Sequence, residues 1–434
     1  MKERLSVFES KSFVVVGVSR DRNKVGHIIF KNLLKAKQKV FGVNPKAEQI
    51  LGQKIYKDIF SIPFKIDCLI IATPKETVPL ILRQAGEKGV PFCIIITAGF
   101  GEANDNKLEE RIKQIAKEEN IRILGPNCFG YVNTDLNVNT TFFDGDIKRG
   151  DIGFISQSGA ISAAMMDKIG KFSKLITLGN AVDISFSESL EYLINDPLTS
   201  VVCLYIEGLS VNEGKQFIDI SRKSKKPIIA LKSGKTKSGQ KAASTHTSSL
   251  ATNSKIYSGI FQQAGIIEVT SISEMFQIAL IVNRFPKLEN NVVILTNAGG
   301  FGVLMSDYCD ENNINLVRLR EETINELNKI LPLNWSHNNP IDILGDANSD
   351  RYQKVLDILE KDSSIKTIIV ILTPQYMAEP EKTAKILSYV KKPLFTCFIG
   401  GEKMLGSQKI LQVNKIINSS EPEKLCGILS KIVK

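Results

Sequence analysis

One histidine, His246, stands in a segment whose composition suits a nucleophile. Its surroundings, GQKAASTHTSSLATNS, are small, flexible and hydroxyl-bearing residues that offer no apolar core for the ring. An imidazole there is accessible to phosphate, and its Nε2 can react with two partners in turn. The alternative is an ordinary surface-loop histidine. His27 and His337 are interpreted as surface or loop-packing side chains without an obvious partner.

A carboxylate, Glu207, follows the apolar run VVCLYI. Active-site groups of parallel sheets gather at the carboxyl ends of strands. Glu207 is therefore a candidate to accept the Nδ1–H of His246 and so leave Nε2 free; alternatively it simply begins a loop. Ser158 and Gly159, in ISQSGAIS, would offer a hydroxyl and backbone N–H groups to phosphoryl oxygens at a helix start.

Three segments share the order strand, small-residue turn, helix: FVVVGVSRDRNKVGHIIF, DIGFISQSGAISAAM and NVVILTNAGGFGVLM. Such a turn directs free N–H groups and the positive end of the helix dipole at one point, which predicts an anion site. The alternative is that small residues merely make the turn tight, since none of the three matches a complete glycine-rich phosphate motif.

The elements that would position these residues alternate along the whole chain. Short apolar runs separated by amphipathic stretches, such as 78–88, predict repeated βαβ units and an α/β fold with doubly wound sheets. A length of 434 residues suggests about three domains. Polar breaks at 133–150 and 285–291 divide them into residues 1–132, 147–285 and 290–434. The predicted strands are 13–16, 40–43, 68–72, 93–97, 122–124, 152–155, 175–177, 201–206, 227–232, 292–295, 316–319, 368–372 and 394–398.

Composition narrows the class of protein. The net charge of +10 favours anionic partners, but the basic residues alternate with acidic ones, which argues against nucleic-acid binding. No apolar stretch is long enough for a membrane helix and no signal core is visible, so we expect a cytoplasmic protein that does not bind membranes. The seven cysteines include no Cys-x-x-Cys pair, and we expect neither a disulfide framework nor a metal site.

Many short motifs of the chain resemble those of one protein family and occur in the same order. They include VGVSRDRNKVG, VNPK, IATP, TAGFGE, GPNCFGYVN, FISQSGA, LGNAVDISF, YIEG, THTSSLA, TNAGGFGVLMSD and NPIDILGDANSDRY. The chain thus resembles the alpha subunit of the ADP-forming acyl-CoA synthetases (acetate–CoA ligase, ADP-forming), which are related to succinyl-CoA synthetase. The resemblance implies a Rossmann-like CoA-binding domain followed by two flavodoxin-like ligase domains.

The resemblance also implies residue roles in binding coenzyme A. The pantetheine diphosphate would be held by Gly17, Ser19 and Lys24, and the nucleotide part by Asn44, Pro45 and Lys46. The pantetheine arm would be flanked by Ala72, Thr73 and Pro74. Near the thioester would stand Gly125, Pro126 and Asn127. By the same likeness Gly300 would help to place a phosphate.

The implied activity is reversible conversion of acyl-CoA, ADP and phosphate into acid, coenzyme A and ATP, through an acyl phosphate and a phosphohistidine at His246. No segment resembles an ATP-grasp module, so the resemblance implies a separate beta subunit that holds ADP or ATP and Mg²⁺ in a hetero-oligomer of α2β2 type. Ser248 and Thr252 replace glycines of the family's histidine motif, which would stiffen that segment.

Two other functions stay open. One is a non-catalytic, CoA-binding regulatory protein, which the altered glycines support. The other is a dinucleotide-binding oxidoreductase, disfavoured because VGVSRDRNKVG lacks the glycine fingerprint and VFGVNPK ends without an acidic residue for a ribose. The acyl group and the choice of ADP over GDP are not predicted.

Overall fold

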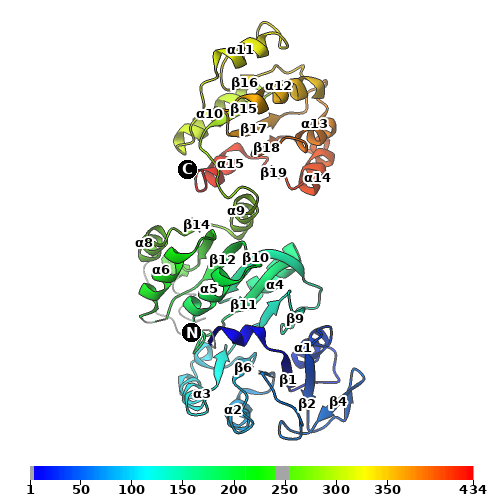
Figure 1. Cartoon of the computed structure of the whole chain (residues 1–434), viewed down its shortest axis with the longest axis vertical. Helices are drawn as coiled ribbons and strands as arrows, with labels where there is room; N and C mark the ends of the chain where they lie inside the picture. Colours follow the sequence, from blue (N-terminus) through cyan, green and yellow to red (C-terminus); the bar gives the residue numbers. More distant parts are fainter. Residues whose placement is uncertain (1–3, 211, 240–253, 434) are drawn as a thin grey trace. The chain divides into compact units, whose positions relative to one another are not determined.

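The computed structural model describes residues 4–210, 212–239 and 254–433. These residues form an α/β protein with three mainly parallel sheets, and they divide into two compact units, Met1–Met275 and Phe276–Lys434 (Figure 1). The first unit contains the first two sheets and the second unit contains the third. His246 lies outside the described residues.

The first sheet has the strand order of dinucleotide-binding domains. Numbered along the chain, its described parallel strands lie in the order 3-2-1-4-5-6. Only β3 is antiparallel to its neighbour. In spatial order the strands are β3 (Gln49–Ile50), β4 (Gln53–Tyr56), β2 (Lys39–Val43), β1 (Ser12–Val16), β5 (Cys68–Ile71), β6 (Phe92–Ile95) and β7 (Arg122–Leu124).

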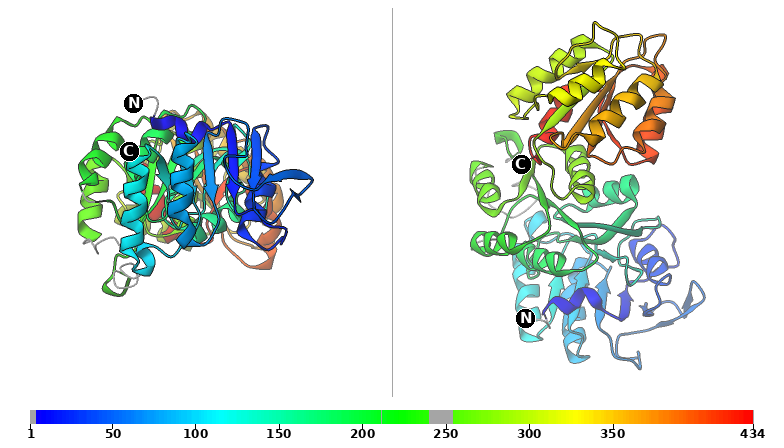
Figure 2. Two further views of the ribbon diagram at one scale, coloured as in Figure 1. Left: turned by 90° about the horizontal axis from the view of Figure 1, so that it is seen from below. Right: turned by 45° about the horizontal axis from the view of Figure 1, so that its top comes forward.

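Alternate residues of β1 bury both faces of this sheet. Val14 and Val16 pack toward α2 (Val78–Glu87) and α3 (Asn106–Glu118), while Phe13 and Val15 pack toward α1 (Val25–Leu33) and the 3-10 helix η1 (Arg4–Glu9). A strand buried on both faces reads as a continuous apolar run, which is why the sequence predicted it. Helices α2 and α3 lie side by side on their face (Figure 2).

The second sheet has a flavodoxin-like order, 2-1-3-4-5, in its described parallel strands. An antiparallel hairpin, β8 and β9, extends it beyond β11. In spatial order the strands are β14 (Ile267–Val269), β13 (Ile228–Lys232), β12 (Val201–Ile206), β10 (Lys148–Ser156), β11 (Lys171–Thr177), β8 (Tyr131–Asn133) and β9 (Val138–Asn139). The described helices of this part are α4 (Gly159–Ile169), α5 (Phe186–Asn195), α6 (Glu213–Lys223), α8 (Ser254–Ala264) and α9 (Ile272–Arg284), which runs on into the second unit.

The third sheet repeats the order 2-1-3-4-5 in its described strands. These are β16 (Ile341–Asp342), β15 (Val292–Thr296), β17 (Thr367–Leu372), β18 (Leu394–Phe398) and β19 (Ile417–Asn418). Helices cover both faces of this sheet (Figure 2). One face carries α11 (Glu321–Asn328), α12 (Ser349–Lys361), α13 (Pro380–Leu387) and α14 (Leu405–Val413); α10 (Gly299–Glu311) packs with α15 (Pro422–Leu429).

The three sheets confirm the predicted fold class, and one predicted strand is wrong. Residues 316–319 form no strand: only Leu316 makes an isolated bridge, to Val292. The 133–150 stretch, expected to be a polar break, contains part of the β8–β9 hairpin. Strand β8 straddles the boundary predicted at residue 132 and pairs with β11. No described helix has the length and apolarity of a membrane span.

Candidate active site

Two glycines allow the turn after β1 to pack closely against neighbouring backbone atoms. Gly17 follows β1 with φ +96°, and a Cβ on it would lie 2.4 Å from the carbonyl oxygen of Ala72. A Cβ on Gly26 would lie 2.2 Å from the carbonyl oxygen of Gly17. Helix α1 therefore begins directly against this turn, with Lys24 exposed at its N-cap. That geometry suits a diphosphate at the helix N-terminus.

His27 packs against the same turn, and the structure supplies a partner that was not obvious from the sequence. The residue is only 5% exposed, and its Nδ1 lies 2.8 Å from the carbonyl oxygen of Ser19. Since a carbonyl can only accept, Nδ1 carries the proton. His337 is exposed, packs against Trp335 and has its Nε2 2.9 Å from the carbonyl oxygen of Leu333.

Asn44 fixes the turn after β2. Its Nδ2 donates to the carbonyl of Val18 at 2.6 Å, and its Oδ1 accepts from the backbone N–H of Lys46 at 2.8 Å. Asn44 therefore joins the turns that follow β1 and β2, while Pro45 and Lys46 stay exposed. This leaves the Lys46 ammonium available to a phosphate.

The ends of β5, β6 and β7 meet close by. Thr97 after β6 donates its hydroxyl to the carbonyl of Thr73 at 2.7 Å. The backbone N–H of Asn127 donates to the carbonyl of Thr97 at 2.9 Å. Pro74 caps a short 3-10 helix and is exposed. These bonds place Thr73 and Asn127 at adjacent strand ends.

The loop after β7 contacts the loop after β11. The backbone N–H of Asn180 donates to the carbonyl of Pro126 at 3.0 Å, and that of Val182 donates to the carbonyl of Gly125 at 3.2 Å. Gly179 makes this approach possible: it has φ +57°, and a Cβ would lie 2.2 Å from the Pro126 carbonyl oxygen. The first and second sheets therefore meet where the loops at the carboxyl ends of β7 and β11 contact each other.

The Ser158–Gly159 turn opens α4 as predicted. Ser158 is the N-cap, and its Oγ accepts from the N–H of Ile161 at 3.3 Å. Its backbone is held by Ser156, whose Oγ donates to the Ser158 carbonyl at 2.9 Å. Gly159 lies against Phe129, since a Cβ on it would be 3.2 Å from the Phe129 Cβ.

Glu207 directly follows β12, and Gln157 fixes its backbone. The Gln157 Oε1 accepts from the N–H groups of Glu207 at 2.6 Å and Gly208 at 3.0 Å, while its Nε2 donates to the Gly208 carbonyl at 2.8 Å. Gln157 was not singled out from the sequence. Its place one residue before Ser158, after β10, is the signal that could have found it.

A buried ammonium lies beneath Glu207. Lys232, at the end of β13, is 5% exposed and donates to the Glu207 carbonyl at 2.9 Å. Its Nζ also lies 4.7 Å from the ring centroid of Tyr257. Burial lowers the pKa of Lys232, and the Glu207 carboxylate opposes that shift. Lys232 thus adds positive charge near the strand end that carries Glu207.

Glu102 and Asn180 form a second polar group that the sequence prediction missed. The Asn180 Nδ2 donates to Glu102 at 2.6 Å and to the buried Glu109 at 2.7 Å, and the Asn180 Oδ1 lies 3.4 Å from the Asn127 amide nitrogen. Glu102 Oε1 also accepts from the N–H of Gly99 at 2.5 Å. Their motifs, TAGFGE and LGNAVDISF, marked the family but gave no role to these side chains.

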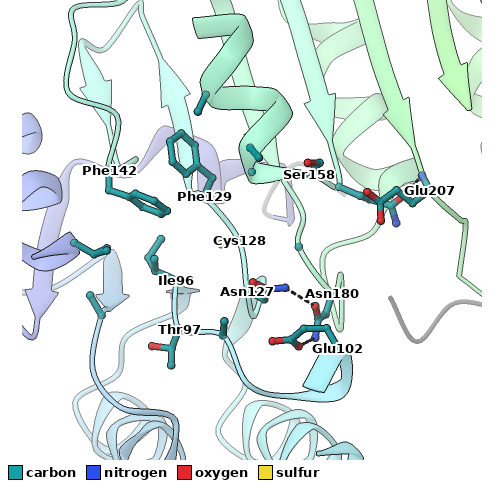
Figure 3. A pocket seen from close by; sticks show the side chains of 18 of the residues that line it. Ile96, Thr97, Glu102, Asn127, Cys128, Phe129, Phe142, Ser158, Asn180 and Glu207 are labelled. Atoms are coloured by element: carbon teal, nitrogen blue, oxygen red, sulfur yellow. Dashed lines mark hydrogen bonds between the residues drawn. The ribbon is translucent and has the colours of Figure 1, made fainter. Parts of the chain in front are cut away.

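One cavity of about 920 Å³ brings several of these residues together. Figure 3 shows Phe142, Phe129 and Ile96 on one side of it and Glu207, Asn180 and Glu102 on the other. The predicted site residues that line it are Ala72, Thr73, Asn127, Ser158, Gly159 and Glu207.

The other predicted site residues lie elsewhere. The turns after β1 and β2 carry Gly17, Ser19, Lys24, Asn44, Pro45 and Lys46, which do not line the cavity, and neither does Pro74. Gly300 lies in the second unit, exposed at the start of α10, where a Cβ would meet nothing within 4 Å. Within the described ranges, no group of three or more His, Cys, Asp or Glu residues is arranged to hold a metal ion.

The three sheets and the cavity define a multidomain α/β protein, and comparison with family models shows that it is built like the CoA ligases. Three family models match in chain order: a CoA binding domain over residues 11–134, a succinyl-CoA ligase like flavodoxin domain over 149–282 and a ligase-CoA domain over 292–398. The chain belongs to the family of ADP-forming acetate–CoA ligases, as its similarity to individual members shows.

Three similarities carry this assignment. The chain is 37% identical to the alpha subunit of acetate–CoA ligase (ADP-forming) II of Pyrococcus furiosus, over 98% of this chain and 96% of that protein. It is 42% identical to acetate–CoA ligase (ADP-forming) of Methanocaldococcus jannaschii, over 98% of this chain. An acetyl-coenzyme A synthetase of Ca. Korarchaeum cryptofilum, solved in complex with phosphate and ADP, superposes with a TM-score of 0.92 at 32% identity and covers 99% of this chain and 96% of that one.

The relatives differ in length. The chain spans 62% of the Methanocaldococcus protein, and 63% of a similar ligase from Archaeoglobus fulgidus, but nearly all of the Pyrococcus alpha subunit.

Proposed function

We propose that the chain is the CoA-binding part of an ADP-forming acid–CoA ligase, which converts acyl-CoA, ADP and phosphate reversibly into acid, coenzyme A and ATP. The observation that carries the proposal is the shared cavity, which is lined both by the strand ends of the CoA-binding domain and by Ser158, Gly159 and Glu207 of the next domain. A thioester and a phosphate would meet there. The names of the similar proteins support the same activity.

The first step would form an acyl phosphate. An oxygen of phosphate attacks the thioester carbonyl, the carbon–sulfur bond breaks, and the CoA thiolate leaves and takes up a proton. Ser158 and the N–H groups at the start of α4 would hold the phosphoryl oxygens, because a helix N-terminus stabilises negative charge. The exposed Lys24 and Lys46 would bind phosphates of coenzyme A.

The second step would use His246, with Glu207 as its partner. The imidazole Nε2 attacks phosphorus, the bond to the acyl oxygen breaks, and the carboxylate leaves. Glu207 would accept the Nδ1–H, which fixes the tautomer and balances the charge of the phosphorylated ring. An oxygen of ADP then attacks phosphorus, the phosphorus–nitrogen bond breaks, and ATP forms.

The nucleotide site is proposed to lie outside this chain. An ATP-grasp beta subunit would bind ADP or ATP with Mg²⁺ and complete a cytoplasmic hetero-oligomer of α2β2 type. The name of the Pyrococcus relative, a subunit alpha, supports a partner, and the greater length of the Methanocaldococcus relative fits a further nucleotide-binding part. Gly300 in the second unit is a proposed phosphate contact. The proposed domains are residues 1–132, 147–285 and 290–434, and the β8–β9 hairpin of the second sheet begins at the first of these boundaries.

Phosphate labelling tests the proposal. The full chain, mixed with the proposed beta subunit and γ-labelled ATP, should acquire acid-labile phosphate. The His246→Ala variant should acquire none. The Glu207→Gln variant should acquire the label more slowly but bind coenzyme A as tightly as the wild type. Equal labelling of the His246→Ala chain would sink the relay. Coenzyme A binding without phosphorylation would favour the regulatory alternative, and tighter binding of NADH than of coenzyme A would favour the oxidoreductase. No comparison supports the non-catalytic alternative.

A further inference from the structure

Both backbone polar groups of Glu207 are bound by side chains from other segments. Its N–H donates to the Gln157 Oε1 at 2.6 Å, and its carbonyl accepts from the Lys232 amino group at 2.9 Å. Two residues further on, the N–H of Leu209 donates to the hydroxyl of Tyr257 at 2.8 Å. The loop that begins at Glu207 is therefore held by three side chains rather than by a continuing strand.

The pairing of two strands places Lys232 beside this loop. Lys232 ends β13, whose other residues, IIAL, are apolar, and in the parallel register it lies opposite Ile206, the residue before Glu207. The N–H of Ser233 continues the pairing by donating to the Ile206 carbonyl at 3.0 Å. A buried lysine at the last position of β13 therefore reaches the carboxyl end of β12 within the protein interior.

The surroundings of the Lys232 amino group fit a protonated ammonium. It donates to the carbonyls of Glu207 and Ser233, and its Nζ lies 4.7 Å from the centroid of the Tyr257 ring. An ammonium has three N–H donors and no acceptor, and the face of an aromatic ring attracts a cation. Two carbonyls and one ring face thus match three donors, so this buried side chain carries a positive charge.

The lining of the cavity, by contrast, is negative. Glu102 and Glu207 both line it, and among its described lining residues there is no Lys, Arg or His. A phosphate in the cavity would therefore face two carboxylates, which repel it. Lys232 does not line the cavity, but the Glu207 carboxylate is close enough to favour the protonated form of this lysine. The same attraction favours the ionised form of Glu207.

The other ionisable groups around this pair have different roles. Lys235 forms an ion pair with Glu268 at 2.6 Å. Burial, and to a lesser extent the Glu207 charge, raises the pKa of Tyr205, so this phenol stays neutral. Tyr257 contributes its ring and its hydroxyl. Among the described residues, Lys232 binds carbonyls and a ring face, so no direct ion pair neutralises its charge.

We propose that Lys232 is a positioning residue for the phosphoryl transfer: it fixes the backbone of Glu207 and keeps the Glu207 carboxylate ionised. The inference rests on the proposed function, because Glu207 acts only in that reaction.

Replacement of Lys232 by methionine tests the proposal, since methionine keeps much of the volume and loses the charge. The full chain, the proposed beta subunit and γ-labelled ATP give the rate of phosphorylation in a single turnover. We expect Lys232→Met to lower this rate at least about tenfold at about pH 8, with the affinity for coenzyme A within about twofold of the wild type. A wild-type rate in folded Lys232→Met would overturn the inference and leave the ligase intact.

The dependence of this loss on pH separates the charge from a purely structural role. Without the ammonium, the Glu207 carboxyl binds a proton more readily, so the deficit of Lys232→Met should grow by about threefold as the pH falls from about 8 to about 5. Lys232→Gln, which keeps a hydrogen-bond donor without the charge, should show the same trend, and it decides the question if Lys232→Met does not fold. A deficit that is the same at both pH values would overturn the inference.

Lys226 supplies a matched control at the opposite end of β13. Like Lys232 it donates to two backbone carbonyls, those of Leu193 and Asp196, and burial lowers its pKa. Lys226→Met therefore removes comparable bonds without touching Glu207, and it should keep the wild-type rate within about threefold at each pH. Circular dichroism confirms that each variant is folded. An equal deficit in Lys226→Met would contradict a positioning role, whereas absence of labelling in the wild type would overturn the proposed function instead.

Discussion

The side chain of Gln157 holds the backbone of Glu207, fifty positions further along the chain, through a single amide group. Its Oε1 accepts from the Glu207 N–H at 2.6 Å, and both ends of the amide bond Gly208. Gln157 follows β10 and Glu207 follows β12, and the two strands pair directly. The carboxylate is thus positioned relative to the Ser158–Gly159 turn, the proposed phosphate site, which begins at the residue after Gln157.

Replacing Gln157 should therefore slow catalysis with little effect on coenzyme A binding. Displacement of a reacting group by about 1 Å can cost roughly 100-fold in rate, and we expect Gln157→Ala to lower kcat by about 10- to 100-fold. Steady-state kinetics with the proposed partner subunit measures kcat, and calorimetry measures coenzyme A binding. Gln157→Glu keeps the acceptors but sets a carboxylate oxygen against the Gly208 carbonyl, so it should not rescue. An unaltered kcat in Gln157→Ala would remove the positioning role.

Asn180 separates two carboxylates, which gives a prediction about pH. Its Nδ2 donates to Glu102 and Glu109, so Asn180→Asp would bring a third carboxylate into the same group. Like charges raise the pKa of the introduced carboxyl in the folded state, which then binds more protons than the unfolded state. Stability of this variant should therefore rise as the pH falls.

The comparison with Asn180→Ala isolates this charge. At pH 8 we expect Asn180→Asp to be less stable than Asn180→Ala by about 2 kcal/mol, and the difference to shrink toward pH 5. Urea unfolding at several pH values measures it. A difference between the two variants that does not depend on pH would show that the introduced carboxyl is not held beside Glu102 and Glu109.

The sequence predicted the sheets well because their strands are buried on both faces. Residues 316–319, LVRL, alternate like a strand and still form none. Asn339 provides the reason: its Oδ1 accepts from the N–H of Ile294 at 3.0 Å, and its Nδ2 donates to the carbonyls of Val292 and Val317 at 2.9 and 3.0 Å. The Asn339 side chain thus occupies hydrogen-bonding positions that a strand at residues 316–319 would use to pair with β15. No local pattern predicts such an insertion.

The candidate site was predictable where strand ends fix it and not where long-range side-chain bonds do. Glu207 and Ser158 follow apolar runs, and both line the cavity. Glu102, Asn180 and Gln157 were missed because their roles depend on partners in other loops. Likewise, His27 has the pattern of a helix-face residue, but its burial depends on how α1 packs on the turn at Ser19.

Arg122 links the first sheet to the second and should contribute to stability. This residue of β7 donates to Asp183 at 2.9 Å and to both oxygens of Glu188 at 2.9 and 2.8 Å. Hydrogen bonding to Glu188, and then to Asp183, raises the pKa of the guanidinium against the effect of burial. Because the group is part-buried, we expect Arg122→Ala to cost roughly 1–3 kcal/mol of unfolding free energy.

Two variants control for the loss of a charge. Arg122→Lys keeps the charge but cannot make the paired bonds, so it should recover only part of the stability. Arg83, whose side chain is 49% exposed beside Glu118, should cost less than about 0.5 kcal/mol when replaced by alanine. Urea unfolding of the full chain measures all three, and equal values for Arg122→Ala and Arg83→Ala would contradict a linking role.

Cys128 lines the cavity but should take no covalent part in the reaction. The thiol is buried, and burial raises its pKa to about 12. Only about one thiol in 10⁴ is then ionised at pH 8, and the thiolate is the nucleophilic form. Its Sγ lies 3.4 Å from the carbonyl oxygen of Ile95, which marks a packed side chain.

Cys128→Ala should therefore keep kcat within about threefold, because no cysteinyl thioester is formed. The wild-type thiol should react slowly with an aromatic disulfide at pH 8 and faster as the pH rises, since the thiolate fraction increases. Rapid modification of Cys128 at pH 8, together with a loss of kcat above 100-fold in Cys128→Ala, would instead identify a reactive thiol at the acyl site.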